Sequence, residues 1–117
     1  MNVWVNGCFD ILHIGHIRML KYAKSMGDRL IVGIDTDERV SKAKGPSRPY
    51  NNVQDRIEML RSMWFIDEIV IFDTNEELCD YIEQFQINTM VVGSDWKGKK
   101  IIGGSLVPHI KYFDRIN

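Results

Sequence analysis

The 117-residue sequence predicts an α/β fold of three layers around a mostly parallel central sheet. Four short apolar runs, at residues 3–5, 29–34, 67–72 and 89–92, have the length of strands, and the run at 29–34 is almost continuously apolar, as is typical of a buried parallel strand. Segments with helical periodicity separate these runs, and a succession of strand, helix and strand forms a right-handed crossover. The chain is long enough for one domain with its own core.

Residues 6–16 (Asn-Gly-Cys-Phe-Asp-Ile-Leu-His-Ile-Gly-His) are the most informative stretch. They lead into a helical segment at 17–26, so we expect a strand, a tight turn at Gly7 and a helix whose first turn carries His13 and His16. Residues three apart lie on one helix face. A helix start offers unpaired N–H groups and a positive dipole end, and the glycine between the histidines allows close approach. These features predict a pocket for the phosphates of a nucleoside triphosphate.

His13 and His16 have two other interpretations, a capping or surface role and a zinc site. One histidine near a helix start is usually a cap or a surface residue, but two that flank a glycine directly after a strand and a turn are less easily accidental. Cys8, His13 and His16 could instead bind zinc, yet their spacing matches no common zinc pattern and a fourth ligand is not evident. We therefore expect no metal-ligating side chains.

The stretch after the first helix predicts the edge of the site. Gly27 ends the helix, and the strand at 29–34 brings Asp35 to the same edge of the sheet as the first turn. Residues 37–51 predict a mobile connection that closes over ligands, with a solvated loop as the alternative. It holds three cations and no acid between residues 41 and 52, which gives a local positive field: Lys42, Lys44 and Arg48.

The second half of the chain predicts two more helices with apolar inward faces. Asn51 or Asn52 caps the first of them, and Thr74 or Asn75 caps the second. The inward residues are Val53, Ile57 and Leu60 in the first helix and Leu78, Ile82 and Phe85 in the second. The aromatic residues at 64–65 are expected in the core or in a subunit contact.

Residues 93–96, Gly-Ser-Asp-Trp, follow the fourth strand at its carboxyl end and form the second half of the expected site. A lone tryptophan after a strand is usually a packing residue. A last short strand is expected at 110–113.

The motif Gly-x-Phe-Asp at residues 7–10, followed by His-x-Gly-His at 13–16, resembles the signature of the cytidylyltransferase-like nucleotidyltransferases. The resemblance covers nearly the whole chain and implies a Rossmann-like three-layer fold. It also implies attack of a substrate phosphate on the α-phosphorus of a nucleotide, with release of pyrophosphate. The catalytic residues that it implies are His13, His16, Lys44 and Arg115.

The same resemblance implies a nucleotide site and a set of phosphate-binding cations. The nucleotide-binding residues would be Gly7, Cys8, Phe9, Asp10, Gly15, Gly93, Asp95 and Trp96. The phosphate-binding residues would be Lys42, Arg48 and Arg56. A Mg²⁺ ion would be carried mainly by the nucleotide phosphates. Asp10 would stabilise the turn or contact the ion indirectly, and Cys8 would be a small packing residue.

Two branches of the family resemble the chain, and they differ in nucleotide. The run at 95–99 (Asp-Trp-Lys-Gly-Lys) resembles the glycerol-3-phosphate cytidylyltransferases, whereas residues 6–8, 48–49 and 102–103 resemble the heptose-1-phosphate adenylyltransferases. Because Trp96 would wall a small pyrimidine pocket, the residues nearest the site lean slightly towards CTP over ATP. The acceptor would be glycerol phosphate, a heptose phosphate or another phosphorylated polyol or sugar.

Two further classes remain as alternatives. A nucleotide-sensing module would keep the phosphate pocket and lack turnover. An NAD-type oxidoreductase would share the layers, but the chain has no Gly-x-Gly-x-x-Gly motif.

The family arginine that Arg115 matches precedes a Ser-Thr-Thr motif and a final helix, whereas this chain stops at Asn117. Residues 1–117 are therefore expected to be a single nucleotidyltransferase domain that lacks this motif. A net charge of −1 argues against a nucleic-acid partner, and no apolar run is long enough to span a membrane. Two separate cysteines fit the cytoplasm. The family resemblance implies a homodimer.

Overall fold

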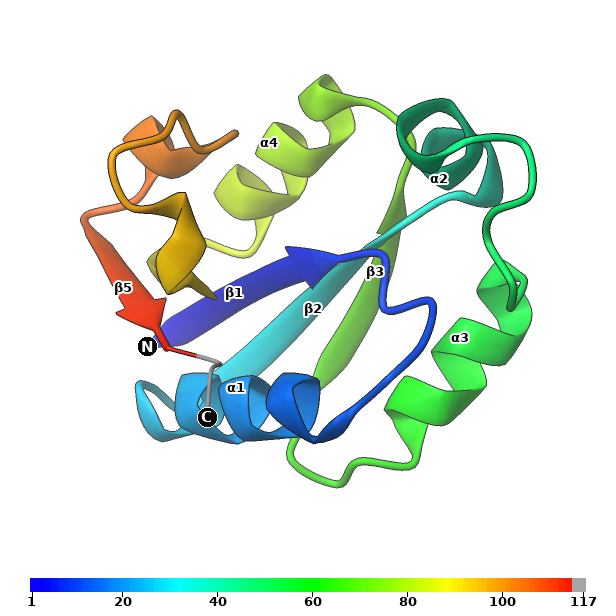
Figure 1. The fold of residues 1–117 in the computed structure, drawn as a ribbon. Helices are drawn as coiled ribbons and strands as arrows, with labels where there is room; N and C mark the ends of the chain where they lie inside the picture. Colours follow the sequence, from blue (N-terminus) through cyan, green and yellow to red (C-terminus); the bar gives the residue numbers. More distant parts are fainter. Residues whose placement is uncertain (115–117) are drawn as a thin grey trace.

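The structure is a computed structural model that describes residues 1–114. Its centre is a five-stranded sheet in which every strand pairing is parallel, in the order β3-β2-β1-β4-β5 (Figure 1). The strands are β1 (Asn2–Gly7), β2 (Arg29–Asp35), β3 (Glu68–Phe72), β4 (Ile87–Gly93) and β5 (His109–Phe113). The helices are α1 (Ile14–Ser25), α2 (Asp37–Lys44), α3 (Val53–Arg61) and α4 (Asn75–Gln84), with short 3₁₀ turns η1 (Ser94–Trp96) and η2 (Gly104–Leu106).

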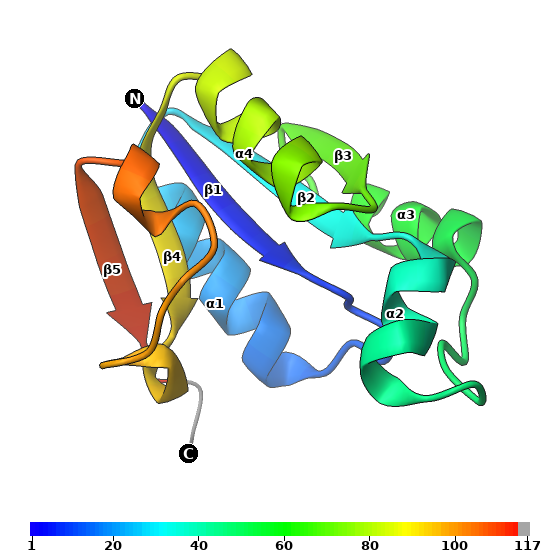
Figure 2. The ribbon, with the colours of Figure 1, turned by 90° about the horizontal axis from the view of Figure 1, so that it is seen from above.

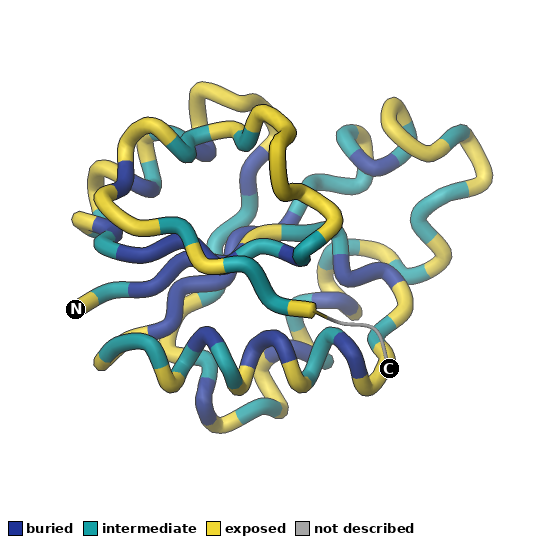
Figure 3. The backbone as a smooth tube through the Cα atoms, turned by 60° about the vertical axis from the view of Figure 1, so that its left-hand side comes forward, coloured by how far each residue is buried: buried dark blue, intermediate teal, exposed yellow. Residues whose placement is uncertain are grey.

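Helices cover both faces of the sheet and complete the predicted three layers (Figures 1 and 2). Successive side chains of a strand point to opposite faces, so Val3 and Val5 pack with α1 and α3, whereas Trp4 between them packs with α4. Figure 3 shows buried positions running along the central strands and exposed positions on the outer helix surfaces. Burial on both faces explains why the strand at 29–34 is almost continuously apolar.

The prediction of an unstructured connection at 37–51 is wrong in its first half, because residues 37–44 form α2. Thr36 caps this helix by accepting a hydrogen bond from the Arg39 N–H at 3.1 Å. Asp37 and Glu38 lie in its first turn, where acids favour a helix start. The helix escaped prediction because Val40 is its one buried residue, so it carries no apolar periodicity.

The other predicted helix ends are confirmed, with one alternative selected at each cap. Asn52 caps α3 by accepting from the N–H of Asp55, and Thr74 forms a capping box with Glu77 at the start of α4. Gly27 follows α1 for a spatial reason, since a Cβ atom there would lie 2.5 Å from the carbonyl oxygen of Met1.

The aromatic pair at 64–65 divides between surface and interior. Phe65 is buried in the core against α1 and α3, whereas Trp64 is 85% exposed and is therefore not a core residue. Phe85 lies at the end of α4 and packs, partly buried, on the opposite core. Within residues 1–114 no helix combines the length and apolarity that a membrane crossing needs.

Candidate functional site

The switch in strand order lies between β1 and β4. The chain runs from β1 outward to β2 and β3, then returns to the other side of β1 to form β4 and β5. β1 and β4 pair with each other only from Asn2 to Trp4, and beyond that point β1 continues beside β2 and β4 continues beside β5. Ligands of open parallel sheets bind beyond the carboxyl ends of the strands at such a switch point. The turn after β1 and the η1 turn after β4 flank this position, as the sequence predicts.

His13 and His16 lie together at the start of α1, and the prediction that they point the same way is confirmed. Their rings stack with 3.9 Å between centroids. His13 is the cap of the helix rather than part of its first turn: its Nδ1 accepts from the Gly15 N–H at 3.1 Å, and Nδ1 of His16 accepts from the His13 N–H at 3.3 Å. A neutral imidazole that accepts at Nδ1 carries its proton on Nε2. In that neutral form, each ring carries an N–H group on its opposite edge.

Phe9 and Cys8 belong to the turn that leads to this histidine pair. Phe9 is buried and has φ of 49°, in the left-handed region that few residues adopt. The edge of its ring packs against His16, with 5.5 Å between ring centroids. Cys8 is partly buried, as expected of a small packing residue. Phe9 packs against His16, and the Cys8 carbonyl accepts a hydrogen bond from Arg56.

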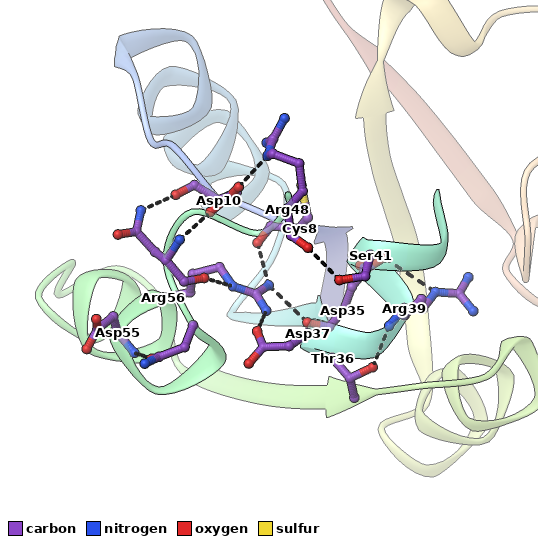
Figure 4. A network of polar contacts seen from close by, with 12 residues as sticks. Cys8, Asp10, Asp35, Thr36, Asp37, Arg39, Ser41, Arg48, Asp55 and Arg56 are labelled. Atoms are coloured by element: carbon purple, nitrogen blue, oxygen red, sulfur yellow. Dashed lines mark hydrogen bonds and ion pairs between the residues drawn. The ribbon is translucent and has the colours of Figure 1, made fainter. Parts of the chain in front are cut away.

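The buried carboxylate of Asp10 anchors the loop that precedes α3 (Figure 4). It accepts hydrogen bonds from the backbone N–H groups of Tyr50 (2.9 Å) and Asn51 (2.8 Å) and from Nε of Arg48 (2.8 Å). Burial by itself would raise the pKa of Asp10, but these donors outweigh it and hold the pKa below its usual value of 3.8. These contacts give Asp10 a turn-stabilising position, and its nucleotide contact stays a prediction.

Three predicted cations lie beside this turn on two different elements. Arg48 pairs with Asp10 and places its guanidinium carbon 4.6 Å from the centroid of the Tyr50 ring. Lys42 and Lys44 are exposed in the last turn of α2. The positive field that the sequence predicts at this edge is therefore carried by a helix end and a loop.

Arg56 is not at the surface of the site, and the structure contradicts its predicted phosphate contact. Its side chain is fully buried, and its guanidinium donates to the backbone carbonyls of Cys8 (2.8 Å), Asp35 (2.9 Å) and Asn51 (3.1 Å). It also pairs with the Asp37 carboxylate at 2.6 Å. Four acceptors inside the protein leave no exposed face for a substrate phosphate.

The second half of the predicted site, which follows β4, is exposed at the protein surface. Gly93 ends β4 and precedes the η1 turn, on which Asp95 and Trp96 are exposed. Trp96 is 44% exposed, and Nζ of Lys99 lies 6.0 Å from the centroid of one of its rings. In this structure Trp96 is therefore a surface aromatic, neither a core residue nor the wall of a closed pocket.

A cavity of about 540 Å³ lies between α2 and the start of α4, beyond the carboxyl ends of β2 and β3. Its lining is polar and of mixed charge, and it includes Asp35, Arg39, Lys42, Asp73 and Asn75. Arg39 pairs with the Asp35 carboxylate at 3.3 Å and donates to Asn75 Oδ1 at 2.8 Å. Burial raises the pKa of Asp35, with Arg39 the main opposing charge.

Sequence reasoning missed this cavity and the partners of Asp10 and Arg56. Asp35 did carry a signal, because it directly follows a buried strand at the edge where sites form. Tyr50 carried none, because its contact with Asp10 uses a backbone N–H group that any residue other than proline provides. Asn51 uses its backbone N–H group and also its side-chain amide, which donates to the Asp10 carbonyl. Arg115 lies outside the described residues, so its placement is not part of this geometry.

A family model described as cytidylyltransferase-like matches residues 4–101, most of the chain. The chain belongs to this family. Among curated proteins it is 43% identical over 115 residues to the bifunctional protein HldE of Campylobacter fetus and 44% identical over 117 residues to that of Sulfurimonas denitrificans. These alignments cover 98% of this chain but only 25% and 24% of the relatives, so the chain spans about a quarter of their length.

Among solved structures, the lipopolysaccharide core biosynthesis protein of Thermoplasma volcanium superimposes with a TM-score of 0.79 over 97% of both chains. The sequences are 21% identical, so this likeness concerns the fold, and it agrees with the predicted Rossmann-like three-layer architecture.

Proposed function

We propose that this chain is a nucleotidyltransferase that moves a nucleoside monophosphate from a nucleoside triphosphate to a phosphorylated sugar or polyol. The stacked histidine pair at the start of α1 carries the proposal, because it presents two N–H donors beside a helix start at the switch point of the sheet. Membership of the cytidylyltransferase-like family supports it.

In the proposed reaction an oxygen of the acceptor phosphate attacks the α-phosphorus in line. The new P–O bond forms as the bond from the α-phosphorus to the bridging oxygen breaks, and pyrophosphate leaves. Such chemistry depends on alignment and charge stabilisation rather than on a protein nucleophile. His13 and His16 donate through Nε2 to phosphate oxygens, Lys44 neutralises developing charge, and Lys42 assists. Arg115 keeps its predicted role as a further cation.

The proposed reaction uses a Mg²⁺ ion that enters the site with the nucleotide and is carried mainly by its phosphates. Within residues 1–114 no group of three histidine, cysteine or carboxylate side chains is placed to hold a metal ion. Mg²⁺ commonly binds through substrate phosphates with few protein ligands. When bound, it would supply further charge neutralisation on the phosphates.

For the substrates we propose ATP and heptose 1-phosphate, the pair of the heptose-type branch that the sequence resembles. Residues 95–99 lean towards CTP, but that argument requires Trp96 to wall the base pocket, and here its side chain is 44% exposed. Eight curated relatives at 39–44% identity carry the name HldE, which supports the heptose-type branch. CTP with a glycerol-type acceptor is the second candidate, and the Asp-Trp-Lys-Gly-Lys run favours it.

The cavity between α2 and α4 is the proposed acceptor site. Lys42 and Arg39 provide cations for a phosphate, and Asp73 and Asn75 provide acceptors for sugar hydroxyl groups. Lys42 is exposed on α2 and lines this cavity.

The assembly and location of the protein are also proposals. Trp64, at 85% exposure, is a large apolar group on the surface next to buried Phe65, and we propose that it contributes to a homodimer interface. Sedimentation of the wild type and of Trp64→Lys at equal concentrations tests this, with the variant expected to be monomeric. The two free cysteines, Cys8 and Cys79, fit a cytoplasmic enzyme.

A substrate panel tests the proposed function. ATP and CTP are each combined with heptose 1-phosphate and with glycerol 3-phosphate in Mg²⁺, and pyrophosphate release is measured. We expect release that needs both substrates and is fastest with ATP and heptose 1-phosphate. Nucleotide binding without release in any combination would favour the sensing module.

A further inference from the structure

We infer that Arg56 is a positioning residue that holds the two phosphate-binding sides of the site in register, a role that rests on the proposed function. One side is the histidine pair, reached through the turn after β1. The other side is α2, which carries Lys42 and Lys44. Arg56 belongs to neither side: it donates to the Cys8 carbonyl in the turn after β1 and pairs with the Asp37 carboxylate at the start of α2.

Arg56 contacts three backbone carbonyls and one carboxylate (Figure 4). Its three carbonyl partners come from different places in the chain: Cys8 follows β1, Asp35 ends β2, and Asn51 precedes α3. Asp37, its ion-pair partner, is the first residue of α2. A single guanidinium therefore joins the carboxyl ends of two neighbouring strands to the helix that follows the second of them.

The position of Arg56 favours arginine over lysine because four acceptors surround it. Arginine presents five N–H donors in a rigid planar fork, whereas lysine has one ammonium on a flexible stem. Burying an unpaired cation costs several kcal/mol, and here three carbonyls and one carboxylate offset that cost. Arg56 is fully buried, so water does not compete with the protein for its N–H groups.

Arg56 is linked to the histidine pair through the turn after β1. The carbonyl of Cys8 is the acceptor directly before Phe9, whose backbone is held at a φ of 49°. The Phe9 ring packs edge-on against His16. A shift of the Cys8 carbonyl would therefore move the ring that supports His16.

Arg56 is linked to Lys42 and Lys44 through α2, the helix that carries both. Val40 is the one buried residue of α2, so apolar packing constrains this helix weakly. Polar contacts place it instead: Arg39 joins it to Asn75, and the Arg56–Asp37 pair joins it to the core. Loss of the Arg56 contacts should leave the turn after β1 and the helix α2 folded but free to move relative to each other.

The test is Arg56→Lys, with Arg61→Lys on the exposed end of the same helix as the matched control. In the ligand-free protein, hydrogen exchange at residues 8–12 and 37–44 should be faster in Arg56→Lys than in the wild type and unchanged in Arg61→Lys. This readout does not depend on turnover, so it separates failure of the positioning role from failure of the proposed function. Unchanged exchange in Arg56→Lys would overturn the inference.

Kinetics supply the readout that a purely structural role would not move. Misplacement by about 1 Å can cost roughly 10²-fold in rate, so kcat of Arg56→Lys should fall by about that factor while KM for ATP stays within about threefold. Combined with Lys44→Ala, the Arg56→Lys change should lower kcat by much less than it does alone, because Lys44 acts through the element that Arg56 positions. Wild-type kcat in folded Arg56→Lys, or full additivity with Lys44→Ala, would contradict the inference.

Asp37→Asn is a milder variant in case Arg56→Lys does not fold. Asp37 is partly exposed, and this change removes the ion pair while keeping the three carbonyl contacts of Arg56. Exchange should then rise at 37–44 and stay low at 8–12, which supports the inference. Equal protection of both segments in Asp37→Asn and in the wild type would overturn it.

Discussion

The rings of His13 and His16 stack with 3.9 Å between their centroids, and each Nδ1 accepts a hydrogen bond from a backbone N–H group of the helix start. The capping contacts thus select one tautomer for both rings and direct the two Nε2–H donors away from the helix. In the proposed function, the contacts that cap the helix also orient the two rings towards the phosphates.

Replacing the first of these histidines by asparagine separates its two tasks. Asparagine is a good helix cap, so His13→Asn should retain the helix and nearly all of the melting temperature. It lacks the distant ring donor, so turnover should fall by roughly 10²–10³-fold, the scale for loss of one oxyanion-stabilising donor. His109→Asn, on the exposed β5 strand, is the control and should be as active as the wild type. Normal turnover in His13→Asn would remove the pair from the catalytic machinery.

The segment from Lys42 to Arg48 should become ordered when phosphates bind. It joins a helix end with exposed lysines to a loop that contains Gly45 and Pro46, and Arg48 in that loop pairs with Asp10. Hydrogen exchange there should slow on addition of ATP with Mg²⁺, because the cations gain phosphate partners. Unchanged exchange, with ATP binding confirmed by calorimetry, would mean that these cations are only solvated.

Asp10 should make the fold more sensitive to acid. Because its pKa is lower in the folded protein than the usual value of 3.8, its contribution to the free energy of unfolding is fully present above that value. The contribution is lost as the pH falls through the lowered folded pKa. Asp10→Asn should therefore be destabilised at pH 7, and its difference from the wild type should shrink towards pH 3 in urea unfolding series.

Asp80→Asn, on an exposed position of α4, is the control for that series and should follow the wild-type curve. A difference between Asp10→Asn and the wild type that stays constant down to pH 3 would show that the carboxylate charge is not what anchors the loop.

The choice of nucleotide can be measured by side-by-side calorimetric titration of ATP and CTP in Mg²⁺. We expect ATP to bind at least tenfold more tightly, a difference of about 1.4 kcal/mol. Tighter binding of CTP would restore the interpretation of residues 95–99 as a pyrimidine site and leave the transfer reaction unaffected.

The parts of the structure that the sequence predicts are those governed by local or periodic rules. Strands buried on both faces are almost continuously apolar, and caps such as Asn52 and Thr74 stand just before an apolar stripe. The helix at 37–44 escaped because Val40 alone is buried in it. Long-range polar contacts left no sequence pattern: Asp10 meets its partners 38 to 41 residues away.

Arg56 shows why a family resemblance misplaces a role. An arginine near a phosphate site is ordinarily read as a phosphate ligand, because arginines are rarely fully buried. Its position on α3, off the apolar stripe, gave no hint that three carbonyls would surround it. Only the three-dimensional arrangement distinguishes a residue that binds phosphate from one that holds the phosphate-binding elements together.

The most direct test of the central claim follows isotopic label from ATP during reaction with heptose 1-phosphate and Mg²⁺. Label at the α-phosphorus should appear in a sugar nucleotide, and label at the γ-phosphorus should appear in pyrophosphate. Both transfers should fall by roughly 10²–10³-fold in His16→Ala and be unchanged in His109→Ala. Transfer of the γ-label to the sugar, or undiminished transfer in His16→Ala, would contradict nucleotidyl transfer at this histidine pair.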